Sequence, residues 1–178
     1  NRRDRELLDD HRDTPAFDID LTLRQQAEGA VVIDGRSAEL FASGHLRGAI
    51  NVGLDGRFAE YAGDVLRPGQ TVILITDPGR ENEARIRLAR IGFDHVIGAL
   101  HDIDRVLVDH PELAEQAPRV TASEVEQRRL VEPDLQIVDV RNPGEVEGGA
   151  IEGALTLPLP QLLDRLGELD PTSPTIVY

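Results

Sequence analysis

Residues 32–51 read VIDGRSAELFASGHLRGAIN. The run opens with two β-branched apolar residues, and the first polar residue is Asp34. This pattern is expected for a parallel strand that is buried on both faces. Ser37 can cap a short helix that Gly44 ends. Residues 49–52 then predict a second strand. This order of strand, helix and strand indicates a parallel α/β sheet.

The same pattern recurs further along the chain. At an offset of 105 residues, Asp34 and Arg36 fall on Asp139 and Arg141. The glycines that follow recur at the same offset, as the pairs Gly44 and Gly149, and Gly48 and Gly153. Later, the apolar run at 71–75 resembles residues 175–178 after a slip of one residue. Self-similarity of this kind indicates two copies of one module.

The rest of the first copy alternates between predicted strands and helices. We expect strands at 71–75 and 95–97, and helices at 58–66 and 80–91, the second of which stops at Gly92. This alternation implies an α/β fold, an open parallel sheet with helices on both faces. Ligands of such sheets bind beyond the carboxyl ends of the strands.

Two tandem modules follow from this pattern. The expected divisions are an N-terminal extension over residues 1–14, a first module over 15–100, a linker over 101–118 and a second module over 119–178. In the second module, 120–125 is a capped helix start, and 142–145 has an N-cap, a Pro at the first helical position and a Glu at the third. This module stops just after its counterpart of the 71–75 strand. We therefore expect it to be truncated, and the natural protein to continue beyond Tyr178.

Composition excludes several classes of function. The 178 residues contain no Cys, so they hold no disulfide, no thiolate metal site and no cysteine nucleophile. The formal net charge of -14 disfavours nucleic acid and anionic membranes as partners. No apolar run is long enough to span a bilayer, and no secretory or lipidation signal stands at the start, so we expect a cytoplasmic protein. His101, Asp102 and Asp104 form the densest group of potential metal ligands, but their spacing favours a solvated linker, and no metal site is expected.

These motifs resemble the signature of the rhodanese family. Asp34-Gly-Arg36 and the SGHLRGAIN run at 43–51 are similar to the family's Asp-x-Arg followed by Gly-His-Ile-x-Gly-Ala-x-Asn. A second copy at 139–155 has Ala150 in place of the His. The resemblance covers nearly everything from residue 31 onward and implies a rhodanese-like fold.

The resemblance also implies roles for these residues. His45 carries over as a structural residue of its turn rather than a catalytic one. The Asp and Arg residues of both motifs are expected to tie strand ends to neighbouring loops, the alternative being simple surface charge.

In active rhodaneses the strand that matches 71–75 ends in a Cys, followed by a loop of backbone amides that binds a persulfide or sulfonate. Here the loop consists of Thr76, Asp77, Pro78, Gly79, Arg80 and Glu81, with Thr76 at the Cys position. A hydroxyl without a neighbouring base is a poor nucleophile and forms no persulfide. Asp77 is expected to cap the next helix with Pro78 at its first position, and Glu81 to favour the helix dipole. The alternative is residual anion binding through Arg80 and the Gly79 amide.

A narrower resemblance suggests a larger protein. With RFAEYAG at 57–63 and DPGRENEA at 77–84 in place of the Cys loop, the first module looks like the degenerate rhodanese of proteins in which a metallo-β-lactamase-fold domain precedes one or two rhodanese domains. Members of that group are similar to persulfide dioxygenases and handle glutathione persulfide or related small sulfur species. The resemblance implies a fused metallo-β-lactamase-fold domain as partner, whose His-x-His-x-Asp-His motif holds the iron or zinc. That motif is absent from these 178 residues, so the metal would belong to the fused domain.

Two further hypotheses stay open. The second module is a working thiosulfate or persulfide sulfurtransferase if a Cys lies just beyond Tyr178. A third interpretation, of a different class, is a module without sulfur chemistry that binds a protein partner.

Overall fold

The computed structural model describes residues 13–178. The chain divides into two compact units, of which the first ends at Pro118 and the second begins at Arg119. Each unit has its own parallel sheet and its own hydrophobic core.

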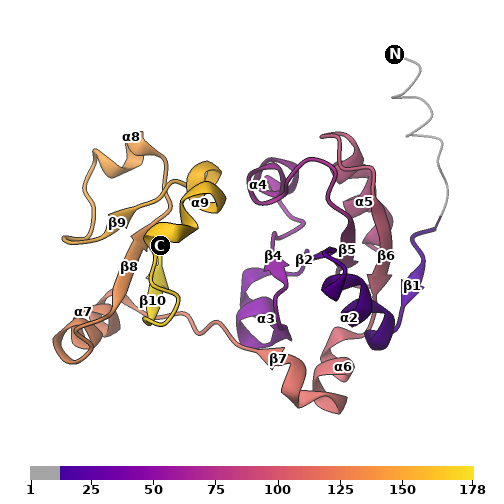
Figure 1. The fold of residues 1–178 in the computed structure, drawn as a ribbon, viewed down its shortest axis with the longest axis horizontal. Coiled ribbons are helices and arrows are strands. Elements are labelled where there is room, and N and C mark those ends of the chain that lie inside the picture. The colour runs from indigo at the N-terminus through magenta and orange to yellow at the C-terminus, as the bar shows by residue number, and fades with distance from the viewer. Residues whose placement is uncertain (1–12) are drawn as a thin grey trace. The chain divides into compact units, whose positions relative to one another are not determined.

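The first unit is built on a parallel sheet in the strand order β1-β6-β5-β2-β4 (Figure 1). Its strands are β1 (Ala16–Phe17), β2 (Val31–Asp34), β4 (Ile50–Asn51), β5 (Val72–Ile75) and β6 (Val96–Leu100). Its helices are α2 (Ile19–Ala27), α3 (Ala38–Ser43), α4 (Phe58–Val65), α5 (Glu81–Ala89) and α6 (Ile103–Asp109). A short antiparallel pair joins β3 (His45–Leu46) to β7 (Ala114–Glu115), just after the 3-10 turn Pro111–Leu113.

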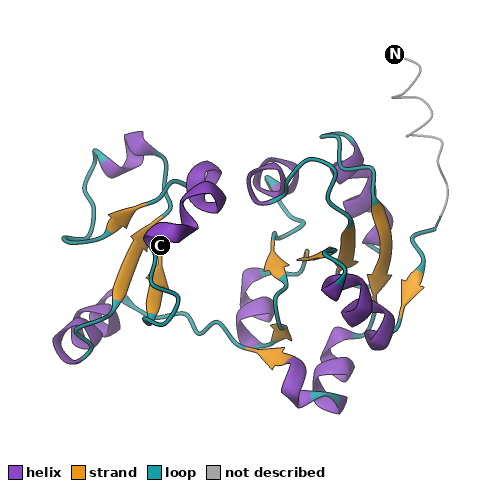
Figure 2. Ribbon diagram, viewed as in Figure 1, coloured by secondary structure: helices purple, strands orange, loops and turns teal. Residues whose placement is uncertain are grey.

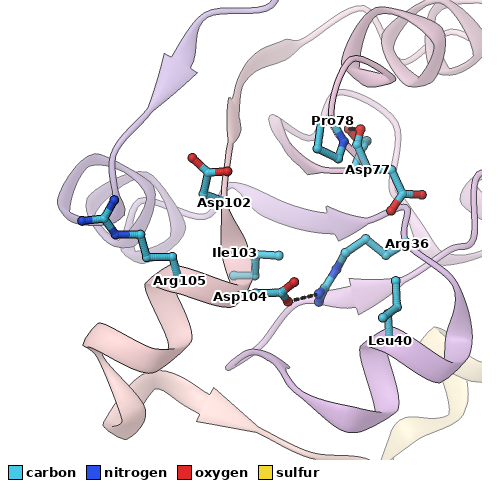
Figure 3. A pocket seen from close by; sticks show the side chains of 9 residues that line it. Arg36, Leu40, Asp77, Pro78, Asp102, Ile103, Asp104 and Arg105 are labelled. Carbon is cyan, nitrogen blue, oxygen red and sulfur yellow. Dashed lines mark hydrogen bonds and ion pairs between the residues drawn. The ribbon is translucent and has the colours of Figure 1, made fainter.

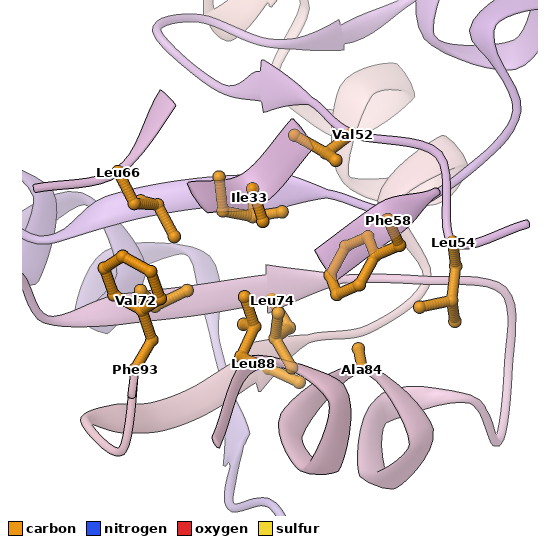
Figure 4. Packing of buried hydrophobic residues seen from close by; sticks show 12 residues of the cluster. Ile33, Val52, Leu54, Phe58, Leu66, Val72, Leu74, Ala84, Leu88 and Phe93 are labelled. Carbon is orange, nitrogen blue, oxygen red and sulfur yellow. The ribbon is translucent and has the colours of Figure 1, made fainter. Parts of the chain in front are cut away.

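Helices cover both faces of this sheet, as expected for an α/β fold. On one face, Leu74 of β5 packs with Phe58 of α4 and with Ala84 and Leu88 of α5 (Figure 4). On the other face, Ile73 and Ile75 pack with residues of α2 and α6. β5 is therefore buried along its whole length, as its unbroken apolar sequence requires.

The second unit repeats part of this plan. Its parallel sheet has the order β10-β8-β9 (Figure 2). The elements are α7 (Ala122–Val131), β8 (Gln136–Asp139), α8 (Pro143–Val146), β9 (Leu155–Thr156), α9 (Leu159–Arg165), the 3-10 turn Leu166–Glu168 and β10 (Thr175–Val177). The caps expected from the sequence are present: Thr121 and Glu124 form a capping box on α7, and Asn142 is the N-cap of α8.

Strand register corrects one detail of the repeat. Asp34 pairs with Ile75, whereas Val138, one residue before Asp139, pairs with Val177. Ile75 therefore corresponds to Tyr178, an offset of 103 rather than 105 residues. The slip between the two copies is two residues, not the single residue that matching Thr71 to Thr175 suggested.

Residues 101–118 are not a linker, contrary to the prediction from their polar composition. Ile103 of α6 is buried against Ile73 and Leu100, and β7 pairs with β3. The segment is therefore part of the first unit and closes one face of its core. The N-terminal extension predicted over residues 1–14 lies almost wholly outside the described residues.

Candidate functional site

Asp34 and Arg36 form a buried ion pair where β2 ends. The Arg36 guanidinium donates from Nη2 to Asp34 Oδ2 at 2.7 Å and to the Gly44 carbonyl at 3.0 Å. Its Nε and its backbone N–H both donate to Asp34 Oδ1 at 3.0 Å. Only 4% of the Arg36 side chain is exposed. The pair thus fastens the end of β2 to the turn that closes α3.

The second unit reproduces this pair. Arg141 donates from Nη2 to Asp139 Oδ2 at 2.6 Å and to the Gly149 carbonyl at 2.9 Å. The hydrogen bond from Arg141, opposed by burial, lowers the pKa of Asp139 to about 2. The Tyr178 ring lies 5.2 Å from the Arg141 guanidinium carbon, and its hydroxyl accepts from the Ile151 N–H at 3.0 Å.

The other motif residues shape the turn after this pair. Gly48 and Gly153 have φ of +75° and +79°, the left-handed region that favours glycine, in turns closed by Ala49 and Ala154 amides. His45 is buried, stacks on Phe41 with ring centroids 3.7 Å apart, and hydrogen bonds the Phe41 carbonyl through Nδ1 at 2.8 Å. These contacts hold the turn after α3 and its counterpart in the second unit in place.

A pocket of about 420 Å³ lies at the carboxyl ends of β2, β5 and β6 (Figure 3). Its lining comes from the three segments that follow these strands, including parts of α3 and α6: Arg36, Leu40, Thr76, Asp77, Pro78, Asp102, Ile103, Asp104 and Arg105. The Arg36 guanidinium points to Asp104, and Nη1 donates to Asp104 Oδ1 at 3.1 Å. The lining carries three carboxylates, Asp77, Asp102 and Asp104, against the two guanidinium groups of Arg36 and Arg105, so its formal charge is negative.

Several polar groups of the loop from Thr76 to Glu81 form hydrogen bonds within the chain. The Thr76 hydroxyl donates to the Asp77 carbonyl at 2.9 Å. The Gly79 N–H donates to Glu81 Oε1 at 3.2 Å, and the same oxygen lies 3.3 Å from His101 Nδ1. The Gly79 amide, which the sequence suggested for residual anion binding, therefore donates to a carboxylate of the loop itself.

Arg80 is engaged in the same way. Its Nη2 lies 3.0 Å from Asp55 Oδ1, and its Nε donates to Glu83 Oε2 at 3.0 Å. The hydrogen bond from Arg80 lowers the pKa of the Glu83 carboxyl. Residual anion binding through Arg80 and the Gly79 amide thus requires these carboxylates to be displaced.

The helix start in this loop differs from the prediction. Asp77 does not cap α5: Asp77, Pro78 and Gly79 form a turn closed by the bond from the Arg80 N–H to the Asp77 carbonyl at 3.2 Å. The helix begins at Glu81, with Arg80 as its N-cap and no side-chain cap bond. A Gly79 φ of +83° interrupts the helical path that Pro78 would otherwise start.

The sequence predicts only part of the lining of this pocket. The β2 and β5 loops were expected, but Asp102, Asp104 and Arg105 were assigned to a linker. A helical pattern was available: Ile103, Val106 and Leu107 follow the i, i+3, i+4 spacing of an amphipathic helix.

The described residues hold neither a metal cluster nor a membrane span. Within 13–178 no group of three or more His, Cys, Asp or Glu side chains could hold a metal ion. In the same residues no helix combines the length and the apolar character needed to cross a bilayer.

Comparison with known proteins gives one family. The family model of the Rhodanese-like domain matches residues 19–101 and 121–178. The uncharacterized protein YqhL of Bacillus subtilis is 46% identical over 43 residues, which cover 24% of this chain and 34% of that protein. The chain thus spans about a third of the length of this curated relative.

Solved structures that are similar to this chain share few residues with it. An anaerobic ergothioneine biosynthesis enzyme from Chlorobium limicola, solved with trimethyl histidine, has a TM-score of 0.51 at 16% identity over 82% of this chain and 41% of that chain. A Rhodanese_3 like domain from Anabaena sp. has a TM-score of 0.45 at 17% identity, over 53% of this chain and 99% of that chain. A thiosulfate sulfurtransferase from Pseudomonas aeruginosa has a TM-score of 0.42 at 19% identity, over 93% of this chain and 38% of that chain. At 16% identity the likeness to the Chlorobium limicola enzyme concerns the fold alone.

Proposed function

The chain belongs to the rhodanese-like domain family, and we propose that it is the sulfur-handling region of a larger protein in which the first unit transfers no sulfur itself. The observation that carries this proposal is the loop after β5. Thr76 stands where β5 ends, its hydroxyl is bonded to the Asp77 carbonyl, and Glu81 occupies the Gly79 amide.

The first unit is unsuited to sulfur transfer in both its nucleophile and its anion site. Sulfur transfer through a persulfide needs a thiolate, and a hydroxyl cannot replace it because it forms no persulfide. A sulfur anion would also have to displace Glu81 and enter a pocket whose lining carries Asp77, Asp102 and Asp104. Like charges at close range raise its free energy there.

We further propose that the region is fused to a metallo-β-lactamase-fold domain that holds iron or zinc and acts on glutathione persulfide. Support comes from the likeness of the Thr76–Glu81 loop to the degenerate rhodanese of such proteins. In this arrangement the first unit supports or docks the metal domain, and small sulfur anions are handled outside its pocket.

A second candidate function rests on strand register. Because Tyr178 corresponds to Ile75, the position equivalent to Thr76 is the one directly after Tyr178. A Cys there would stand where β10 ends, beside the intact Asp139 and Arg141 pair. The second unit would then be a thiosulfate or persulfide sulfurtransferase.

The third candidate is a protein-interaction module without sulfur chemistry. As in the main proposal, its first unit transfers no sulfur. It differs in having no metal domain in the same polypeptide. The sequence on both sides of residues 1–178 in the natural protein therefore separates the three candidates.

The experiment starts with the natural protein, by intact mass and terminal peptide sequencing, and then measures oxygen uptake with glutathione persulfide. We expect Thr76→Ala and Glu81→Gln to leave turnover within about twofold of the parent, because neither residue contacts the reacting sulfur. A Tyr61→Phe variant, far from the loop in sequence, is the matched control. A tenfold or larger loss with Thr76→Ala alone would overturn the assignment of a silent first unit.

A Cys found directly after Tyr178 would call for a second assay. Incubation with thiosulfate and intact mass analysis should then show one added sulfur atom on the second unit. Its absence would eliminate the sulfurtransferase candidate.

A further inference from the structure

The Arg36 guanidinium faces the pocket of the first unit, and the Asp104 carboxylate is already bound to it (Figure 3). We propose that this guanidinium is a binding position for small oxyanions, such as thiosulfate or a sulfonate, and that Asp104 occupies it as an internal ligand that closes the pocket to them. This role rests on the proposed function of the first unit, which transfers no sulfur, and it names the residue that keeps sulfur anions out.

Arg36 presents one nitrogen to the pocket. Its Nε and Nη2 donate to Asp34, and Nη2 also donates to the Gly44 carbonyl at 3.0 Å. Among residues 13–178, Nη1 donates to Asp104 alone, at 3.1 Å. Only 4% of the Arg36 side chain is exposed, so the pair with Asp34 holds the guanidinium in one place. A charge-assisted hydrogen bond from Nη1 to an anion would therefore form without ordering a flexible side chain.

Asp104 binds this nitrogen from the solvent side. Its side chain is 88% exposed, whereas that of Arg36 is buried. It directly follows Ile103, which packs with Ile73 and Leu100 and so fixes the start of α6 beside the pocket. An exposed carboxylate gains little from an ion pair, because water screens the attraction. Asp104 can therefore be replaced on Arg36 without unfolding the unit.

The space around this contact suits a small anion once the Asp104 carboxylate is removed. The pocket has a volume of about 420 Å³, and Leu40, Pro78 and Ile103 give it apolar walls. Beside such walls a hydrogen bond to an anion is stronger than in bulk water. Without the Asp104 charge the lining carries two carboxylates and two guanidinium groups, so its formal charge is zero. Asp104 is thus both the competitor for the Arg36 nitrogen and the source of the excess negative charge.

Two other roles of Asp104 make different predictions. If Asp104 acts only through its charge, the neighbouring carboxylate of Asp102 should exclude anions equally well. If Asp104 only ties α6 to the loop after β2, its removal should lower the stability of the first unit and admit no anion. The internal ligand alone predicts that an anion binds when Asp104 is changed and that the unit stays folded.

The test compares two substitutions that remove the same charge from the same pocket. Asp104→Asn releases the Arg36 nitrogen from a carboxylate, whereas Asp102→Asn leaves that contact in place. Asp102 has a φ of +50°, a conformation that Asn also adopts. In the described part of the chain its side chain makes no cap hydrogen bond to α6, so the control loses no helix cap.

Thiosulfate, and sulfate as a second oxyanion, are titrated into the full chain while NMR follows the Arg36 Nε–H and the Leu40 backbone N–H. We expect Asp104→Asn to bind thiosulfate about tenfold or more tightly than the parent, the size of one hydrogen bond to a charged group. Asp104→Ala, which removes the carboxylate altogether, should behave in the same way. Asp102→Asn should stay within about threefold of the parent, because water and salt screen its exposed charge. Urea midpoints of all four proteins should agree.

Three results would overturn the proposal. Equal tightening by Asp104→Asn and Asp102→Asn would mean that the charge of the pocket alone excludes the anion. Binding to the parent as tight as to Asp104→Asn would mean that Asp104 excludes nothing. Anion-dependent shifts in none of the proteins would mean that Arg36 is no oxyanion position. The assay measures binding and not turnover, so each of these results leaves the test of Thr76 in sulfur transfer unaffected.

Discussion

β5 and β10 have the same place in two copies of one module, yet their surroundings differ. Leu74 in β5 is completely buried, whereas Val177 at the equivalent register position is 58% exposed. Both strands follow an Asp and Arg pair of nearly identical geometry. A local motif such as the Asp and Arg pair therefore forms wherever its residues recur. The burial of a strand side chain depends instead on segments distant in sequence.

The largest expected effect comes from breaking the more deeply buried ion pair. Asp34→Asn removes the buried carboxylate that pairs with Arg36 and leaves only the exposed Asp104 beside the guanidinium, which should lower the free energy of unfolding of the first unit by about 3–5 kcal/mol. Asp139→Asn should cost the second unit less, because water reaches Arg141, whose side chain is 32% exposed. Urea unfolding followed by hydrogen exchange resolves the two units. Equal losses of unfolding free energy in the two variants would show that burial of the Arg side chain does not determine the size of the destabilisation.

A core substitution comes next. Leu88→Ala opens a cavity beneath α5, against Leu74, and should reduce the stability of the first unit by about 2–5 kcal/mol. Leu130→Ala is the control in the second unit: Leu130 is 86% exposed, so its loss should stay within about 0.5 kcal/mol. A comparable loss for Leu130→Ala would mean that the outer face of α7 is covered.

Acid should affect the second unit through Asp139. Its folded pKa of about 2 lies below the ordinary value of 3.8, so its contribution is complete above pH 3.8 and is lost as the pH falls toward 2. We expect the urea midpoint of the second unit to fall in this window, and Asp139→Asn to remove that part of the decrease. In a Tyr61→Phe background Tyr178 is the only tyrosine and its fluorescence reports the second unit. An unchanged pH slope in the variant would contradict the role of Asp139.

The smallest effect concerns a helix cap. Thr121→Ala removes the side-chain oxygen that accepts from the Glu124 N–H and should cost the second unit about 1 kcal/mol. Thr121→Ser keeps the oxygen and serves as the control. In the first unit the corresponding test is Asp18→Ala, since Asp18 caps α2 in the same manner. A cost for Thr121→Ser equal to that of Thr121→Ala would argue against the cap.

Local signals made much of the fold predictable. Ser37 and Gly44 bound α3, the apolar run of β5 forms a buried strand, and Thr121 caps α7, all as the sequence indicated. Such features depend on residues a few positions apart, whose preferences survive folding. The predicted start of α5 was wrong because Pro78 and Gly79 act together. Pro at the first helical position favours a helix, but the glycine with positive φ directly after it makes a turn instead.

The candidate pocket was less predictable. Its carboxylates Asp102 and Asp104 lie in a polar segment, where the helical spacing of Ile103, Val106 and Leu107 was the only local sign of a core contact. Only packing of Ile103 on Ile73 and Leu100 brings Asp104 within 3.1 Å of Arg36. The engagement of the Gly79 amide by Glu81 likewise depends on the turn that this loop adopts.

The sequence by itself determined the α/β class, the duplication, the absence of a thiol nucleophile and the positions of both Asp and Arg pairs, because each follows from residue type and short spacing. Only the tertiary structure decided that residues 101–118 belong to the first unit and that the pocket is net negative. These features arise where segments far apart in the chain meet, and contacts between such segments are set by packing of the whole unit rather than by local preference.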